Sequence, residues 1–248
     1  MCSSDLLTTS SANQAHRMNT FVNLVATRCK NGGHAALFRW YNDHVHILMR
    51  FDGLQRAALY HRATTPDADG HAAPEYFCLY EFATQADFMA FEVSDAREQA
   101  RQVLLAGWGK EGIEITQRRQ FWRLGARATH NAVAAGDGLW HVQSLQLGAG
   151  PLEGVARWLG DCVHRALDPD AVGHQAWHRA ADATDAGGDA LVVAQTASAQ
   201  AHAPSPWQPE WWLGSSDGGR GHAAWGHAPA TTATAWQAPY QRLCVWER

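Results

Sequence analysis

The chain has 248 residues, 46% of them hydrophobic, and a formal net charge of -4. This length and composition suffice to bury a full core, either in one large domain or in two small ones fused along an interface. The weakly acidic balance and the lack of any basic run argue against a nucleic-acid-binding surface, so we expect no nucleic-acid partner.

Cysteine usage and the N-terminus are typical of a protein in a reducing compartment. The five cysteines are scattered without C-x-x-C spacing, which suggests neither a disulfide framework nor a zinc knuckle. Residues 1–18 form a polar tail without the basic region or the apolar core of a signal peptide. No segment approaches the roughly 20 apolar residues that a membrane-spanning helix needs. We therefore predict a cytoplasmic protein with no membrane partner.

The first half of the chain, residues 19–124, alternates strand and helix patterns. Period-two apolar runs predict strands, and apolar residues at helical spacing predict an amphipathic helix. Phe51-Asp52-Gly53 ends that helix, and Thr84 has the character of an N-cap for a second helical region. The predicted elements are a strand over 21–28, a helix over 35–49, strands over 54–63 and 75–82, helical segments over 85–91 and 94–108, and a strand over 113–124.

The second half, residues 139–248, follows a small and polar stretch over 125–138 that we interpret as a linker. Its patterns have the same order, except that a Trp- and Pro-rich segment over 203–226 stands where a second helix would be expected. The predicted elements are strands over 140–147, 173–180, 190–196 and 232–247, with a helix over 152–167.

Two octets indicate an internal duplication. Residues 39–46 and 157–164 share the pattern R-W-x-x-D-x-V-H, and the related strings Y-H-R-A at 60–63 and W-H-R-A at 177–180 follow at nearly the same distance. Chance explains two matches in one register poorly, so each half predicts the fold of the other. The order strand-helix-strand-strand-helix-strand is that of a ferredoxin-like unit. We therefore predict an α+β protein of two tandem ferredoxin-like repeats packed sheet to sheet.

Three segments of the first half resemble a known family. They are Phe38 to His46, Phe51-Asp52-Gly53-Leu54, and Tyr76 to Phe82. Together they are similar to the dimeric α/β-barrel superfamily, especially its EthD-like and RedY-like members. Such proteins are usually dimers of one unit, so the resemblance implies a pseudo-dimer within one chain and leaves a further homodimer open. Its relatives include cofactor-free polyketide cyclases and dehydratases, lactone isomerases and small quinone-forming monooxygenases.

The first octet carries the predicted catalytic residues, which are Tyr41, Asp43, His44 and His46. A histidine with a pKa near neutrality can take or give a proton, and a neighbouring carboxylate raises its basicity. His44 is the best candidate because the second octet has Cys162 in its place, so we expect the chemistry mainly in the first repeat. Asp43 and His46 recur in the second octet. A structural role, with His46 buried, is therefore the alternative for those two.

Polar side chains within apolar strands are candidates for substrate binding, because a buried polar group costs free energy unless it is paired. Each could instead be half of a structural hydrogen bond. The twelve tryptophans could pack a core or wall a cavity for a flat, apolar ligand. The predicted substrate-binding residues are Asn23, Trp40, Tyr60, His61, Tyr80 and Glu81.

We predict neither a metal nor a cofactor. His44 and His46 lie two positions apart on the predicted helix and so point in different directions. The sequence contains no phosphate-binding or nucleophile motif, and no haem ligand stands out among fourteen histidines. The predicted function is general acid/base cyclisation, dehydration or isomerisation of an aromatic or conjugated, polyketide- or indole-type intermediate. The alternatives are a non-catalytic binder of a similar apolar molecule and a cofactor-free monooxygenase.

Overall fold

The computed structural model describes residues 20–31, 33–63, 73–128, 139–147, 172–181, 188–196 and 232–248. These residues divide into two compact units. Unit 1 comprises the described residues of 1–60, 74–123 and 243–248, and unit 2 comprises those of 61–73 and 124–242. No helix in the described ranges is long and apolar enough to cross a membrane.

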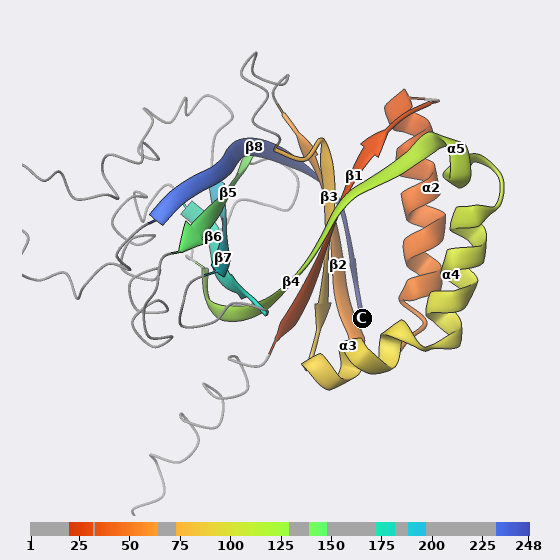
Figure 1. The fold of residues 1–248 in the computed structure, drawn as a ribbon, viewed down its shortest axis with the longest axis horizontal. Coiled ribbons are helices and arrows are strands. Elements are labelled where there is room, and N and C mark those ends of the chain that lie inside the picture. Colours follow the sequence, from red (N-terminus) through yellow and green to blue (C-terminus); the bar gives the residue numbers. More distant parts are fainter. Residues whose placement is uncertain are drawn as a thin grey trace, which may run out of the picture. The chain divides into compact units, whose positions relative to one another are not determined.

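Unit 1 has the predicted order strand, helix, strand, strand, helical region, strand (Figure 1). The sheet order is β4-β1-β3-β2, and β1 pairs antiparallel with both β3 and β4. The strands are β1 (Phe21–Cys29), β2 (Leu54–Arg62), β3 (Tyr76–Phe82) and β4 (Ile113–Ala128), and the helices are α2 (Gly33–Leu48), α3 (Gln85–Glu92), α4 (Asp95–Leu105) and α5 (Trp108–Gly112). The ends of β2 and β4 belong to unit 2, and β4 extends into the segment predicted as a linker.

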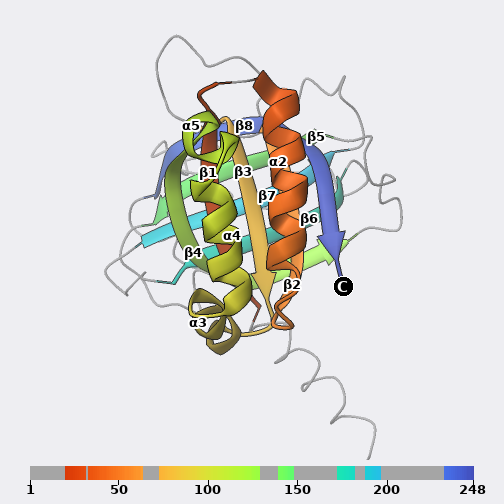
Figure 2. The same ribbon diagram turned by 90° about the vertical axis from the view of Figure 1, so that its right-hand side faces the viewer.

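Helices α2 and α4 lie side by side over one face of the unit 1 sheet, as Figure 2 shows. Helix α2 buries a stripe of residues at helical spacing, which is the pattern of an amphipathic helix against a sheet. The buried residues of α2 are Leu37, Tyr41, His44, Val45 and Leu48. Tyr41, His44 and Leu48 therefore share one face of the helix, and this face is buried in the core of the unit.

Two side-chain caps divide the helical region after β3. The hydroxyl of Thr84 accepts a hydrogen bond from the Asp87 backbone N–H at 3.1 Å, as predicted, and Ser94 caps α4 in the same way. The predicted continuous segment over 94–108 is instead α4 followed by α5. Between them Gly107 has a φ of +58°, a conformation that favours glycine.

The register of β1 against β3 sorts the side chains of unit 1 between the two faces of the sheet. Asn23 lies opposite Tyr80, and Val22 lies opposite Glu81. Because successive side chains of a strand point to opposite faces, Asn23 and Tyr80 share one face and Val22 and Glu81 share the other. Helices α2 and α4 cover the first of these, which we call the helix-covered face.

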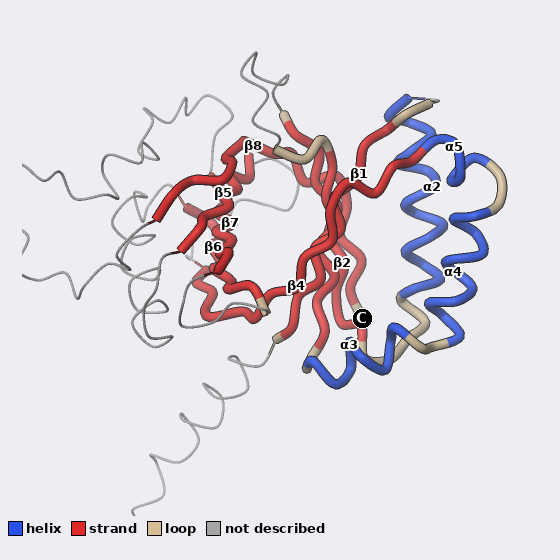
Figure 3. Tube along the Cα trace, viewed as in Figure 1, coloured by secondary structure: helices blue, strands red, loops and turns tan. Residues whose placement is uncertain are grey.

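The described elements of unit 2 are all strands, as Figure 3 shows. They are β5 (Leu139–Leu147), β6 (Val172–Ala180), β7 (Gly188–Thr196) and β8 (Thr232–Glu247), whose last residues belong to unit 1. Their order is β8-β5-β7-β6, so the first strand again lies between the third and the fourth, and β5 is antiparallel to both. The described strands of the two units therefore have the same order, and the duplication itself stays a prediction. The second octet, the predicted helix over 152–167 and the segment over 203–226 lie outside the described residues.

Candidate functional site

A cavity of about 50 Å³ lies within unit 1, between the helices and the helix-covered face of the sheet. One water molecule occupies roughly 10–15 Å³ by this measure, so the cavity holds about three to five. Its polar and aromatic lining includes Asn23, Thr27, Trp40, Tyr41, His44, Tyr80, Glu92, Arg97 and Arg118.

His44 is the titratable base of this cavity and is 9% exposed. Burial lowers its pKa to about 4, the positive charges of Arg97 and Arg118 lower it too, and a hydrogen bond to the Ala100 backbone opposes them. Its Nδ1 has no hydrogen-bond partner in the described part of the chain. Nε2–H therefore donates to the Ala100 carbonyl, and the Nδ1 lone pair is free to accept a proton at neutral pH.

Trp40 fixes the orientation of the His44 ring. The two rings stack with centroids 4.3 Å apart and an interplanar angle of 20°. Gly109 of α5 lies against the indole, because a Cβ at that position would come within 2.7 Å of Trp40 Nε1. A side chain there would displace the indole, so Gly109 indirectly positions the histidine.

Two tyrosine hydroxyls lie in the cavity wall. Tyr41 shares a hydrogen bond of 3.0 Å with Thr27, and burial raises the pKa of Tyr41 far above its usual value. Burial likewise raises the pKa of Tyr80. Both phenols are therefore protonated at physiological pH and can donate hydrogen bonds to a developing negative charge.

Asn23 adds a second buried polar group without a partner. Its side chain is 7% exposed, and Oδ1 makes no hydrogen bond with any described residue. A buried carbonyl oxygen left unpaired costs free energy, and a bound molecule that donates a hydrogen bond would remove that cost. Asn23 and His44 thus both line the cavity, and each has one buried acceptor atom without a partner among the described residues.

The outer part of the cavity is charged. Arg97 Nε lies 3.4 Å from Glu92 Oε1, and both side chains line the cavity. Arg118 also lines it and is exposed, as is Ile115 beside it on β4. The cavity therefore opens to solvent next to Glu92 and Arg118.

Half of the residues predicted for the site line this cavity, namely Asn23, Trp40, Tyr41, His44 and Tyr80. Asp43 and His46 do not, because both are exposed on α2. Two positions along a helix turn a side chain by roughly 200°, which carries His46 to the side opposite His44. The alternative prediction that His46 is a buried structural residue is therefore wrong.

Glu81 and Tyr60 face the other side of the sheet, so neither lines the cavity. Glu81 is ion-paired at 2.7 Å with both Arg56 and Arg123. Burial alone would raise the pKa of Glu81, and the two guanidinium groups outweigh burial and hold it below its ordinary value. Tyr60 stacks on Phe77 with ring centroids 4.7 Å apart. Glu81 and Tyr60 therefore interact with other residues of the fold and do not line the cavity.

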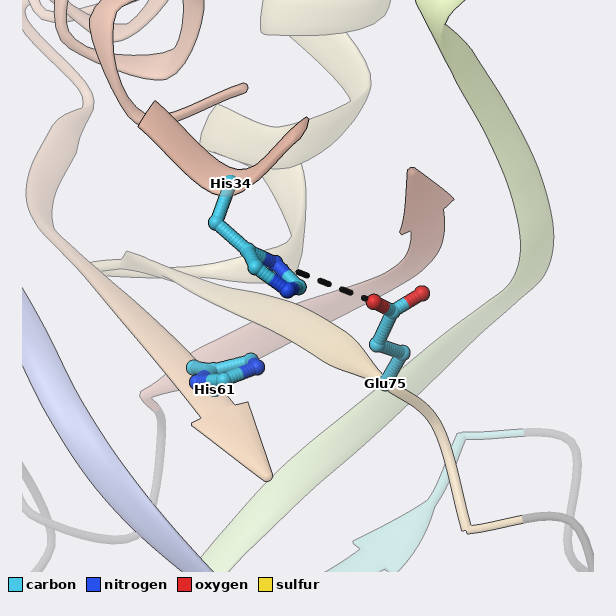
Figure 4. A group of neighbouring side chains, drawn as sticks. All are labelled: His34, His61 and Glu75. Carbon is cyan, nitrogen blue, oxygen red and sulfur yellow. Dashed lines mark ion pairs between the residues drawn. The ribbon is translucent and has the colours of Figure 1, made fainter. Parts of the chain in front are cut away.

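His61 also lies away from the cavity, among the groups in Figure 4. His34 Nδ1 is 3.9 Å from Glu75 Oε1 and contacts the Tyr76 hydroxyl, while Glu75 Oε2 accepts from the Cys29 backbone N–H. The His34 side chain is 64% exposed.

Sequence patterns alone did not identify Thr27, Glu92, Arg97 or Arg118 as site residues. The sequence could have indicated Thr27, because Thr27 lies four residues after Asn23 on the predicted strand and side chains an even number of positions apart share one face of a strand. Arg118 lies across from Val25 in the pairing of β1 with β4, which only the register reveals. Glu92 and Arg97 come from two helices whose relative placement the sequence does not specify.

The fold is similar to solved structures, whereas no family model and no curated protein sequence matches the chain. A proposed monooxygenase from Fusobacterium nucleatum subsp. nucleatum ATCC 25586 has a TM-score of 0.60 at 9% identity, covering 93% of this chain and 95% of that chain. Another from Lactobacillus acidophilus NCFM has a TM-score of 0.55 at 8% identity, with 92% and 96% covered. An anthrone oxidase-like protein has a TM-score of 0.54 at 10% identity, with 93% of each chain covered.

These likenesses concern the fold. They show that this chain shares its fold with the three solved structures. Such low identities transfer no catalytic residue to this chain.

Proposed function

We propose that this protein is a cofactor-independent oxygenase of an aromatic or conjugated small molecule, with His44 as the general base. The observation that carries the proposal is the unpaired Nδ1 of His44, buried in a cavity and free to accept a proton. The names of the three similar structures favour oxygenation over the cyclisation or dehydration expected from sequence. Within this proposal the two units form a pseudo-dimer, related to EthD-like or RedY-like proteins.

The proposed reaction begins with a proton transfer. His44 Nδ1 removes a proton from an acidic CH₂ group flanked by aromatic rings, and the resulting carbanion reduces dioxygen and combines with it to give a hydroperoxide. Loss of water from the hydroperoxide leaves a carbonyl group, so that CH₂ and O₂ become C=O and H₂O. The protonated phenols of Tyr41 and Tyr80 donate hydrogen bonds to the enolate-like oxygen as its charge develops.

The cyclase and binder alternatives differ from this proposal in their use of dioxygen. A cyclase or dehydratase would use the same histidine without consuming oxygen, and a binder would leave its ligand unchanged. Anthrone is a suitable first substrate, because its acidic CH₂ group lies between two aromatic rings. Oxygen uptake with formation of anthraquinone therefore distinguishes the three functions in one assay.

We expect the wild-type protein to consume one dioxygen for each anthrone oxidised. The variant His44→Ala should lose about 10²- to 10⁴-fold in rate, the usual contribution of a positioned general base. His46→Ala is the matched control, because it removes an exposed imidazole from the same helix and should retain the wild-type rate. A folded His44→Ala protein with full activity, or conversion of anthrone without oxygen uptake, would reject the proposal.

A further inference from the structure

The charges around the cavity are unbalanced. Its lining contains two guanidinium groups, those of Arg97 and Arg118, and one carboxylate, that of Glu92. Glu92 pairs with Arg97 at 3.4 Å. Arg118 makes neither an ion pair nor a hydrogen bond with the residues that the structure describes. The cavity therefore has an excess positive charge at its opening.

The inner part of the cavity requires hydrogen-bond donors from a bound molecule. Asn23 Oδ1 and His44 Nδ1 are hydrogen-bond acceptors without a partner among the described residues, on side chains that are more than nine-tenths buried. A molecule that satisfies them must donate hydrogen bonds from its inner end. Arg118 lies on β4 directly across from Val25 of β1. Val25 lines the cavity, and so do Asn23 and Thr27, which lie two residues before and two residues after it on β1. Asn23 and Arg118 therefore lie on neighbouring strands, on the face that α2, the helix of His44, covers.

We propose, on the basis of the function above, that Arg118 selects a substrate that bears a negative charge at one end and an acidic O–H or C–H at the other. The anionic end, a carboxylate or an ionised phenol on the aromatic skeleton, binds the Arg118 guanidinium at the opening. The acidic end enters the cavity and donates to His44 Nδ1. Arg118 is thus a specificity-determining residue of the same site.

This arrangement also links substrate charge to the strength of the base. In the empty cavity the positive charges of Arg97 and Arg118 help to lower the pKa of His44. A bound anion offsets those charges, so the pKa of His44 rises toward neutrality, where a general base is most effective. A neutral analogue of the same shape would bind without this gain in basicity.

The test compares two probes of similar shape and different charge, 4-hydroxybenzoate and 4-hydroxybenzamide, by calorimetric titration. We expect the wild-type protein to bind the carboxylate roughly tenfold more tightly than the amide, as one charge-assisted hydrogen bond provides. Arg118→Gln should bring the ratio of the two Kd values to about one, with the Kd of the amide unchanged. Arg39→Gln is the matched control, because Arg39 is exposed on α2 and does not line the cavity, and this variant should keep the wild-type ratio.

Three outcomes would overturn the inference: no preference for the carboxylate in the wild type, no binding of either probe, or an unchanged preference in Arg118→Gln. The titrations require no turnover, so they separate this inference from the proposed function. Charge preference without oxygen uptake from anthrone would reject the oxygenase and retain the selectivity of Arg118. Oxygen uptake without charge preference would reject the selectivity alone.

Discussion

The two faces of the unit 1 sheet differ in whether the acceptor atoms buried there have partners. On the face away from the helices, the carboxylate of Glu81 lies between two guanidinium groups at 2.7 Å. On the helix-covered face, Asn23 and His44 each keep an acceptor atom without a partner in the described ranges. The Glu81 carboxylate thus has its partners within the described chain, whereas the two acceptor atoms on the helix-covered face have none there.

This contrast shows how structural and functional polar groups can be told apart. Sequence patterns made both residues candidates for the site, His44 as the catalytic base and Glu81 as a substrate-binding residue. Pairing separates them, because a buried polar group that is fully hydrogen-bonded supports the fold, while an unpaired one in a cavity is available to a ligand. Substitutions on the two faces should therefore change stability in different directions.

The largest expected effect follows Glu81→Gln. Removing this charge leaves the mostly buried Arg123 without a counter-ion and Arg56 with only the exposed Glu247, which should lower the free energy of unfolding by about 3 kcal/mol. Urea denaturation at pH 7 measures the change. Glu247→Gln is the control, because Glu247 also pairs with Arg56 but is 62% exposed, and its loss should cost at most about 1 kcal/mol. Equal losses in the two variants would contradict the structural role of Glu81.

The next effect concerns pH, through His44. The pKa of this residue is about 4 in the folded protein against 6.5 ordinarily, so the unfolded chain binds the proton more tightly. His44 therefore contributes stability that is present above pH 6.5 and is lost as the pH falls toward 4. The loss should be on the order of 3 kcal/mol, at about 1.4 kcal/mol for each pH unit. The measurement is the free energy of unfolding as a function of pH.

Two variants isolate this contribution from that of the carboxylates, which also titrate in acid. His44→Gln should show a smaller fall in stability between pH 7 and pH 4 than the wild type does. His46→Gln removes an exposed histidine of the same helix and should follow the wild-type curve. Coincident curves for His44→Gln and the wild type would show that His44 titrates as it does in water.

The smallest expected effect has the opposite sign. Asn23→Leu replaces an unpaired buried amide by an apolar group of similar size, so it should raise the free energy of unfolding by about 1 kcal/mol. The same variant should bind 4-hydroxybenzamide more weakly, because the cavity then lacks one acceptor. Thermal unfolding and calorimetric titration measure the two changes. A destabilised Asn23→Leu protein would indicate that the amide has a structural partner.

Local patterns in the sequence predicted much of unit 1. Helical spacing placed Tyr41 and His44 on one face of α2, and Thr84 marked the start of α3, because capping and amphipathicity depend on residues a few positions apart. Alternation likewise found the strands to within a few residues at most ends. The two octets predicted the fold of the second half from the first, and the described strands of the two units have the same order.

The tertiary structure decided which polar residues belong together. Alternation shows that Tyr80 and Glu81 face opposite sides of a strand, and only the packing of α2 and α4 decides that Tyr80 is on the side with the cavity. Arg97 and Arg118 come from a helix and a strand that are separate in sequence, so no local pattern joins them to His44. The sequence by itself therefore determined the elements and their buried faces. The site required the structure, because a cavity forms between elements whose spacing is set by long-range packing.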